Sequence, residues 1–205
     1  MIRFLAILAA VTAAVLLGIG LAISMRGPQQ DAFAQCRAGQ VAGGDIGGPF
    51  ELVNAEGETV TDADVITEPS LVYFGYTFCP DVCPLDVARN AVAVDILEEM
   101  GVSATPVFIS IDPNRDTPEV VGQFAGNMHE KMIGLTGSDE QVRAASQAYR
   151  TFYSIAGDPE DPYYLVDHST MTYLVLPEHG FVDFFRRDAD ADQIAETVAC
   201  YAQNM

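Results

Sequence analysis

Downstream of residue 49, short apolar runs alternate with segments of helical periodicity. Segments 49–53 and 56–60 predict a β-hairpin around Gly57, and the uninterrupted apolar runs 71–75 and 105–111 predict buried strands. Helices are predicted over 84–100, from a cap at Asp116 or Thr117 through about 124, over 140–153 and over 190–203. Further strands are predicted over 163–166, 171–176 and 181–185, the first two paired around the turn 167–170.

The longest predicted helix, 84–100, repeats its apolar residues at helical spacing. The expected buried side consists of Leu85, Ala88, Val92, Ile96 and Leu97. Strands alternate with helices first, and antiparallel strands follow. This order predicts an α/β fold with a mixed sheet flanked by helices on both faces and an N-terminal β-hairpin.

A second pattern precedes this domain. Residues 4–23 form an uncharged apolar run between Arg3 and Arg26. Twenty residues at a rise of about 1.5 Å span about 30 Å, the thickness of a bilayer core, so we expect a transmembrane helix. A removed signal peptide is the alternative, since Ala32-Phe33-Ala34 resembles a peptidase site. The predicted organisation is therefore a membrane anchor over 1–26, a flexible tether over 27–48 that is rich in Gly, Gln and Ala, and a domain over 49–205.

The basic start followed by an apolar run and a large domain is typical of a bacterial inner-membrane protein with its soluble domain in the periplasm. Beyond Arg26 the chain has 8 basic and 29 acidic residues, a net charge of −21. Such a field repels nucleic acid, so no nucleic-acid partner is expected, whereas cations and basic protein surfaces are attracted.

The chemistry-bearing residues are Cys79, Cys83 and His168. The two cysteines lie one helical turn apart at the predicted start of the helix 84–100, and His168 lies in the turn 167–170. Two thiolates and one imidazole are the ligands that Cu(I) prefers, whereas a dithiol at a helix N-terminus also suits thiol–disulfide exchange. Backbone N–H groups at the helix N-terminus are expected to favour the thiolate form of the two cysteines. Besides copper binding and thiol–disulfide exchange, a purely structural disulfide is the third alternative.

Another histidine could also carry chemistry. His129 has Met128 and Met132 as neighbours in the sequence, so a thioether–imidazole copper patch is one interpretation. A polar loop at a helix end explains the same residue without a function. His179 lies in a polar turn, which is explanation enough.

Three segments together resemble the Sco/SenC family. They are 78–84 (Phe-Cys-Pro-Asp-Val-Cys-Pro), 110–118 (Ser-Ile-Asp-Pro-Asn-Arg-Asp-Thr-Pro) and 167–169 (Asp-His-Ser), in the order in which the family has them. The resemblance covers most of the chain from Gly44 onward. It implies a thioredoxin-like fold and a membrane-anchored copper protein that helps to assemble the dinuclear copper site of cytochrome c oxidase.

The resemblance also implies roles for individual residues. Cys79, Cys83 and His168 become the copper ligands, and Asp167 matches an acidic position that orients the ring or tunes the site. Copper is expected as Cu(I), while Cu(II) would require a further ligand such as water or Asp167. Arg115 and Asp116 also resemble family residues, and we interpret them as turn and helix-cap residues.

The implied partners are an oxidase copper-site subunit, a copper donor and the inner membrane. We expect a metallochaperone rather than an enzyme. The alternatives are a thiol–disulfide reductase that keeps the oxidase copper-site cysteines reduced, and a redox or copper sensor. His168 separates the first two, because dithiol exchange requires no imidazole ligand.

Cys36 and Cys200 remain outside this ligand set. One lies in the predicted tether and the other in the last predicted helix. In an oxidising periplasm, a structural disulfide between them is the simplest outcome, and it requires the tether to run beside the final helix.

Overall fold

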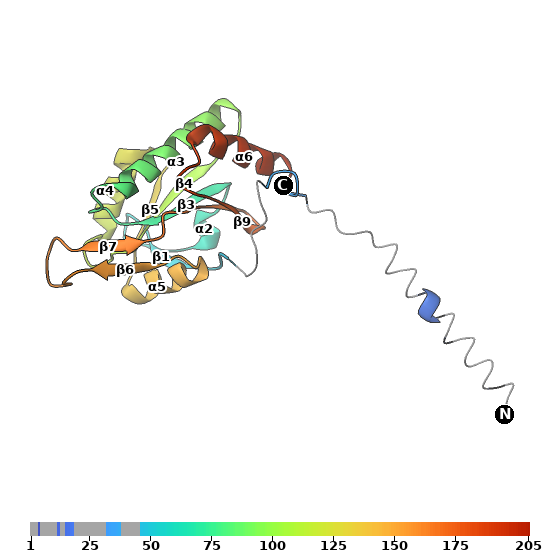
Figure 1. The fold of residues 1–205 in the computed structure, drawn as a ribbon, viewed down its shortest axis with the longest axis horizontal. Helices are drawn as coiled ribbons and strands as arrows, with labels where there is room; N and C mark the ends of the chain where they lie inside the picture. The colour runs from blue at the N-terminus through green and yellow to red at the C-terminus, as the bar shows by residue number, and fades with distance from the viewer. Residues whose placement is uncertain (1–3, 5–11, 13–14, 19–31, 38–45) are drawn as a thin grey trace. The chain divides into compact units, whose positions relative to one another are not determined.

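The computed structural model describes residues 4, 12, 15–18, 32–37 and 46–205 (Figure 1). The chain divides into two compact units, 1–35 and 36–205. Most of the predicted anchor over 1–26 and much of the predicted tether over 27–48 lie outside the described residues. Among the residues that are described, no helix has both the length and the apolar character needed to cross a bilayer.

A five-stranded mixed sheet forms the centre of the larger unit. Its strands follow the order β5-β4-β3-β8-β9. The central strand β3 (Ser70–Gly75) pairs in parallel with β4 (Thr105–Ser110) and antiparallel with β8 (Thr172–Leu176). All residues of these three strands are buried, which explains their continuous apolar runs. The edge strands are β5 (Ile133–Leu135) and β9 (Gly180–Phe185).

Two small hairpins form separate two-stranded sheets, the first of which is joined to the end of β5 by a single bridge between Val53 and Thr136. The first pairs β1 (Glu51–Val53) with β2 (Thr59–Thr61), as the sequence predicts, and turns at Gly57 with a φ of 79°. The second pairs β6 (Tyr153–Ala156) with β7 (Leu165–His168). The predicted pairing of 163–166 with 171–176 is therefore wrong, because β8 is buried along its whole length between β3 and β9.

Helices cover the sheet and fill the connections between strands (Figure 1). They are α2 (Asp62–Val65), α3 (Val82–Glu99), α4 (Pro118–Met128), α5 (Asp139–Ala148) and α6 (Ala191–Gln203). The short α2 and strands β5 and β6 are absent from the sequence prediction. Helix α4 continues beyond the predicted end near 124 until His129, whose extended backbone ends it.

The predicted helix 140–153 ends too late. Helix α5 stops at Ala148, and Arg150 takes a left-handed φ of 52°. The Arg150 N–H donates to the Gln147 carbonyl and the Thr151 N–H donates to the Ser146 carbonyl, which is a Schellman ending. Arginine at a position where glycine is usual gives no stop signal in the sequence. The freed segment forms β6, the partner of β7.

The buried side of α3 also differs from the prediction. Leu85 is 60% exposed and Val92 is 49% exposed, while Asp86 and Asn90 are buried. The polar pair is accommodated by hydrogen bonds, since Asp86 accepts from the Tyr73 hydroxyl at 3.1 Å and the Asn90 amide donates to the Thr172 hydroxyl at 2.9 Å. Satisfied polar groups can occupy a buried face, so apolar spacing alone misplaces it.

The larger unit is closed by a disulfide between Cys36 and Cys200, at a Cα–Cα distance of 5.6 Å. Cys200 lies in α6, which packs beside α3. The bond joins residues 164 positions apart, so it links the start of this unit to its last helix. Cys79 and Cys83 both remain free thiols.

We expect the paired replacement Cys36→Ser and Cys200→Ser to lower the free energy of unfolding by about 2–5 kcal/mol, because so long a loop is left open in the unfolded chain. Urea unfolding of the full-length variant and the wild type, both with the dithiol reduced, measures the difference. Reduction of all disulfides in the wild type should reproduce the same loss. An unchanged unfolding midpoint in the variant contradicts the prediction.

Candidate metal centre

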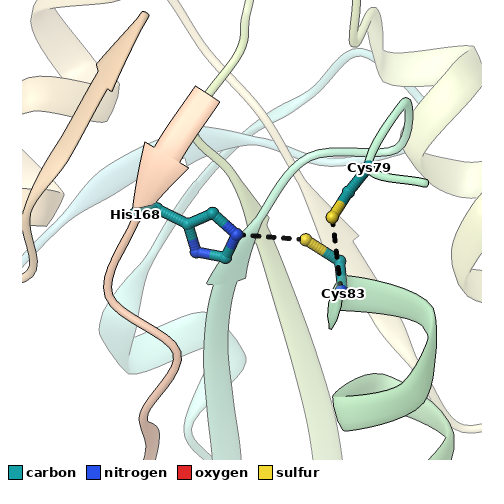
Figure 2. Close-up of side chains that lie close together, drawn as sticks. All are labelled: Cys79, Cys83 and His168. Carbon is teal, nitrogen blue, oxygen red and sulfur yellow. Dashed lines mark hydrogen bonds between the residues drawn. The ribbon is translucent and has the colours of Figure 1, made fainter. Parts of the chain in front are cut away.

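The structure brings Cys79, Cys83 and His168 together beyond the carboxyl end of the central strand β3 (Figure 2). Cys79 lies in the loop after β3, Cys83 in the first turn of α3, and His168 at the end of β7. The Cys83 Sγ lies 3.3 Å from the His168 Nε2. The three possible ligand atoms all lie within 4.8 Å of one another.

This spacing fits a single soft cation. Bonds from a d¹⁰ ion to sulfur and imidazole nitrogen are about 2.0–2.3 Å long, so two ligands of one ion lie up to about 4.6 Å apart. The observed separations need only a small contraction to satisfy that limit. Two sulfurs and one imidazole, without a carboxylate, are a donor set that selects Cu(I) over hard cations.

The Cys79 sulfur substitutes for a helix cap. Asp81 occupies the N-cap position of α3 but makes no side-chain capping hydrogen bond. Instead, the Cys83 N–H donates to the Cys79 Sγ at 3.3 Å, as Figure 2 shows. One of the unpaired N–H groups of the first helical turn thus points at a ligand atom, where it stabilises negative charge on sulfur.

The imidazole of His168 is held in one tautomer. Its Nδ1 lies 2.8 Å from the Ser169 carbonyl oxygen, which can only accept, so Nδ1 carries the proton. The lone pair of Nε2 is then directed at the Cys83 sulfur. Burial, the main cause, lowers the pKa of His168 below its usual value, so the ring is neutral near pH 7. A neutral ring with a free Nε2 is ready to bind a metal.

Two tyrosine rings enclose the imidazole edge-on. The Tyr73 and Tyr76 centroids lie 6.2 and 5.9 Å from that of His168, with interplanar angles of 88° and 86°. Tyr73 is fixed by the buried Asp86, whose other oxygen accepts from the Arg187 Nε at 3.2 Å. Sequence reasoning did not identify Tyr73 or Asp86 as part of the site. Tyr73 looks like an ordinary residue of a buried strand, and Asp86 looks like an ordinary polar residue of a helix.

The Cys83 side chain is fully buried. Burial, the largest cause, raises the pKa of Cys83 well above its usual value, and a hydrogen bond with Cys79 raises it further. The expectation that the helix N-terminus favours a thiolate is therefore wrong for Cys83. Desolvation outweighs the helix dipole at this position.

The sulfur fits because β3 ends in a glycine. A Cβ at Gly75 would lie 3.1 Å from the Cys83 Sγ and 2.8 Å from a ring carbon of Tyr73. Any larger residue must displace a ligand atom or the ring beside it.

Asp116 holds the loop that carries Cys79. Its carboxylate accepts from the Thr77 N–H at 2.9 Å, from the Thr77 hydroxyl at 2.5 Å and from the Ser110 hydroxyl at 2.6 Å. The interpretation of Asp116 as a helix cap is therefore wrong, since Thr117 caps α4 by accepting from the Val120 N–H. Burial raises the pKa of Asp116, and the three hydrogen bonds oppose that shift.

Asp167 is exposed on β7 and precedes His168. Neighbouring side chains on a strand point to opposite faces, and the described ring-orienting hydrogen bond goes to Ser169 instead. The described hydrogen bond therefore assigns no ring-orienting role to Asp167, and its role in tuning the site stays a prediction. The negative charge of Asp167 raises the pKa of His168 and so opposes the lowering caused by burial.

His129 is not part of a described metal site. Its Nε2 lies 3.2 Å from Asp95 Oδ1, and its Nδ1 accepts from the Lys131 N–H at 3.1 Å. One ring nitrogen thus contacts α3 and the other contacts the turn after α4, while Met132 is buried in the core. The ordinary explanation by a helix-end loop accounts for this residue.

Comparison with known proteins identifies clear relatives. A family model described as SCO1/SenC matches residues 38–203. SenC of Rhodobacter capsulatus is 53% identical over 197 residues, which are 96% of this chain and 89% of that protein. A mitochondrial SCO1 homolog 1 of Arabidopsis thaliana is 43% identical over 154 residues; they are 75% of this chain but only 46% of that longer relative.

A solved structure also resembles the chain. The crystal structure of Arabidopsis thaliana ScoI with copper bound superposes with a TM-score of 0.73 at 41% identity, and the match covers 77% of this chain and 99% of that one. The mixed α/β thioredoxin-like fold expected from the sequence is confirmed.

The buried thiol predicts a pH dependence of stability. A folded-state pKa above the unfolded value means that stability is complete below about pH 8.5 and falls as pH rises past it, because only the unfolded chain releases the proton. Between pH 7.5 and 9.5, we expect reduced metal-free protein to lose about 1 kcal/mol more unfolding free energy than Cys83→Ala. Denaturant unfolding at several pH values measures both slopes. Parallel slopes refute the prediction.

Proposed function

The chain belongs to the SCO1/SenC family, and on that premise we propose that it is a copper chaperone for the dinuclear copper site of cytochrome c oxidase. The cargo is copper, bound through Cys79, Cys83 and His168. Its partners are a copper donor and the oxidase subunit that receives the metal. The motifs at 78–84, 110–118 and 167–169 support this role, since the family they resemble assembles that site.

The observation that carries the proposal is the convergence of the three ligand atoms within 4.8 Å. The three residues come from a loop, a helix and a separate hairpin, up to 89 positions apart along the chain. A structural disulfide would require only the two cysteines, and both are free. The neutral imidazole directed at Cys83 adds the third ligand that Cu(I) requires.

Copper binding displaces protons from this site. Because the Cys83 thiol is protonated near neutral pH, its proton must leave when a copper–sulfur bond forms. The positive charge of Cu(I) then replaces it in a buried position, which removes the desolvation penalty of an uncompensated thiolate. Oxidation of the dithiol would remove both sulfur ligands, so loading requires the reduced protein.

We propose that the domain acts on the periplasmic side of a bacterial inner membrane, anchored by the apolar run 4–23. The Cys36–Cys200 disulfide supports an oxidising compartment, where structural disulfides persist. The same compartment favours oxidation of Cys79 and Cys83 to a disulfide, so a reducing partner is expected to keep the two thiols reduced.

A thiol–disulfide reductase is the second candidate. The observation that favours it is the pair of free sulfurs at the start of α3, with the Cys83 N–H donating to the Cys79 Sγ. Cys79 would be the attacking thiol, because burial keeps Cys83 protonated. This activity would keep oxidase cysteines reduced without any need for His168.

Replacement His168→Ala separates the two candidates. Loss of one of three ligands should lower Cu(I) affinity by about 100-fold or more, as measured by competition with a chromophoric chelator under anaerobic, reducing conditions. His179→Ala is the matched control, since His179 is exposed in a turn, and it should bind copper like the wild type.

A thiol–disulfide reductase would give the opposite result in this experiment. His168→Ala would then retain full disulfide-reducing activity on a model oxidase peptide, and the wild type would show little copper affinity. Unchanged Cu(I) affinity in His168→Ala overturns the three-ligand site.

A further inference from the structure

The hairpin that carries His168 is not part of the main sheet. Strands β6 and β7 form a separate two-stranded sheet, shown in orange at one side of the molecule in Figure 1. Backbone pairing within the described strands therefore does not fix the distance from His168 to the two sulfurs. The three residues 169–171 tie His168 to β8, and side-chain contacts between the hairpin and the cysteine segment, such as the Val166 N–H donating to the Tyr76 hydroxyl at 3.3 Å, hold it further.

Arg115 supplies such a contact. Its guanidinium carbon lies 3.7 Å from the centroid of the Tyr164 ring and 4.8 Å from that of Phe78. Phe78 immediately precedes Cys79, and Tyr164 immediately precedes β7. A third ring, that of Tyr76, lies 5.7 Å away, so the cation makes cation–π contacts with both segments that bear ligands.

Hydrogen bonds fix the guanidinium in this place. Its Nε donates to Asp112 Oδ2 at 2.5 Å, and its Nη1 donates to the Tyr164 carbonyl at 2.9 Å and to the Pro162 carbonyl at 3.3 Å. The other oxygen of Asp112 accepts from the Tyr164 hydroxyl at 2.5 Å. Asp112 is buried, so its bonds with Arg115 and with the Tyr164 hydroxyl are shielded from water.

The other side of the same loop holds the cysteine segment. Asp116, one residue after Arg115, accepts from both the backbone and the hydroxyl of Thr77. The segment 112–116 therefore contacts the hairpin through Arg115 and Asp112, and the cysteine loop through Phe78 and Thr77. Turn formation alone requires none of these cross-contacts.

We propose that Arg115 is a positioning residue that holds the β6–β7 hairpin against the cysteine loop and so keeps the His168 Nε2 within binding distance of Cys83. The inference deepens the proposed function and rests on it for the copper readout. Arg115 itself contacts no ligand atom. Its planar guanidinium combines ring stacking with several directed hydrogen bonds, which the ammonium group of lysine cannot reproduce.

The test is Arg115→Lys, which keeps the charge and removes the planar fork. In the metal-free protein, amide hydrogen exchange of β7 should accelerate at least tenfold, and the NMR signals of the His168 ring should shift or broaden. Cu(I) affinity should fall about tenfold. Arg143→Lys, on the exposed side of α5, is the matched control and should change neither quantity.

A double-mutant cycle with His168→Ala tests whether Arg115→Lys lowers Cu(I) affinity through the position of His168. Without the imidazole, Arg115→Lys should change Cu(I) affinity less than twofold, because the hairpin no longer bears a ligand. An equal loss in both backgrounds overturns the proposal, as does unaltered exchange of β7 in metal-free Arg115→Lys. If Arg115→Lys does not fold, Phe78→Leu removes one ring of the contact and is judged by the same measurements.

The metal-free exchange distinguishes this inference from the proposed function. Wild-type protein that binds no copper would refute the chaperone role and leave the exchange measurement to decide whether Arg115 holds the hairpin. Copper binding with unaltered exchange in Arg115→Lys would retain the chaperone role and refute the positioning role.

Discussion

Burial of the Cys83 sulfur beneath the imidazole of His168 is the constraint on which the whole site depends. It demands a glycine at position 75, because any Cβ there meets the sulfur or the ring of Tyr73. It also keeps the thiol neutral until a metal cation arrives, since an uncompensated thiolate is costly in so dry a place. The pocket is thereby made selective: a soft cation can replace the proton, while water and hard ions gain little from two sulfurs.

The two halves of the site are assembled by different forces. Cys83 is carried by α3, which begins close to the end of β3 and packs on a sheet whose central strands are completely buried. His168 is carried by a hairpin outside that sheet, held by polar and aromatic contacts around the 112–116 loop. A rigid sulfur side and a separately held imidazole side suit the proposed role, in which the protein both binds a cation and releases it.

Sequence patterns predicted the central strands, the start of the helix near Cys83 and the residues that converge, because these depend on local apolar runs and on short motifs. They could not predict the partner of β7, since α5 ends at Arg150 without glycine and the strand that follows resembles a continuing helix. They also misplaced the buried side of α3, where Asp86 and Asn90 are stabilised by distant partners. The bonds of Asp116 to Thr77 span 39 residues, beyond the reach of any local rule.

The disulfide has a mechanical consequence. Because Cys36 is bonded to Cys200, tension applied to the chain ahead of Cys36 passes covalently into α6. The covalent path from Cys36 through Cys200 bypasses residues 37–199, so such tension reaches β3, the cysteine loop and the hairpin only through the packing of α6 on α3.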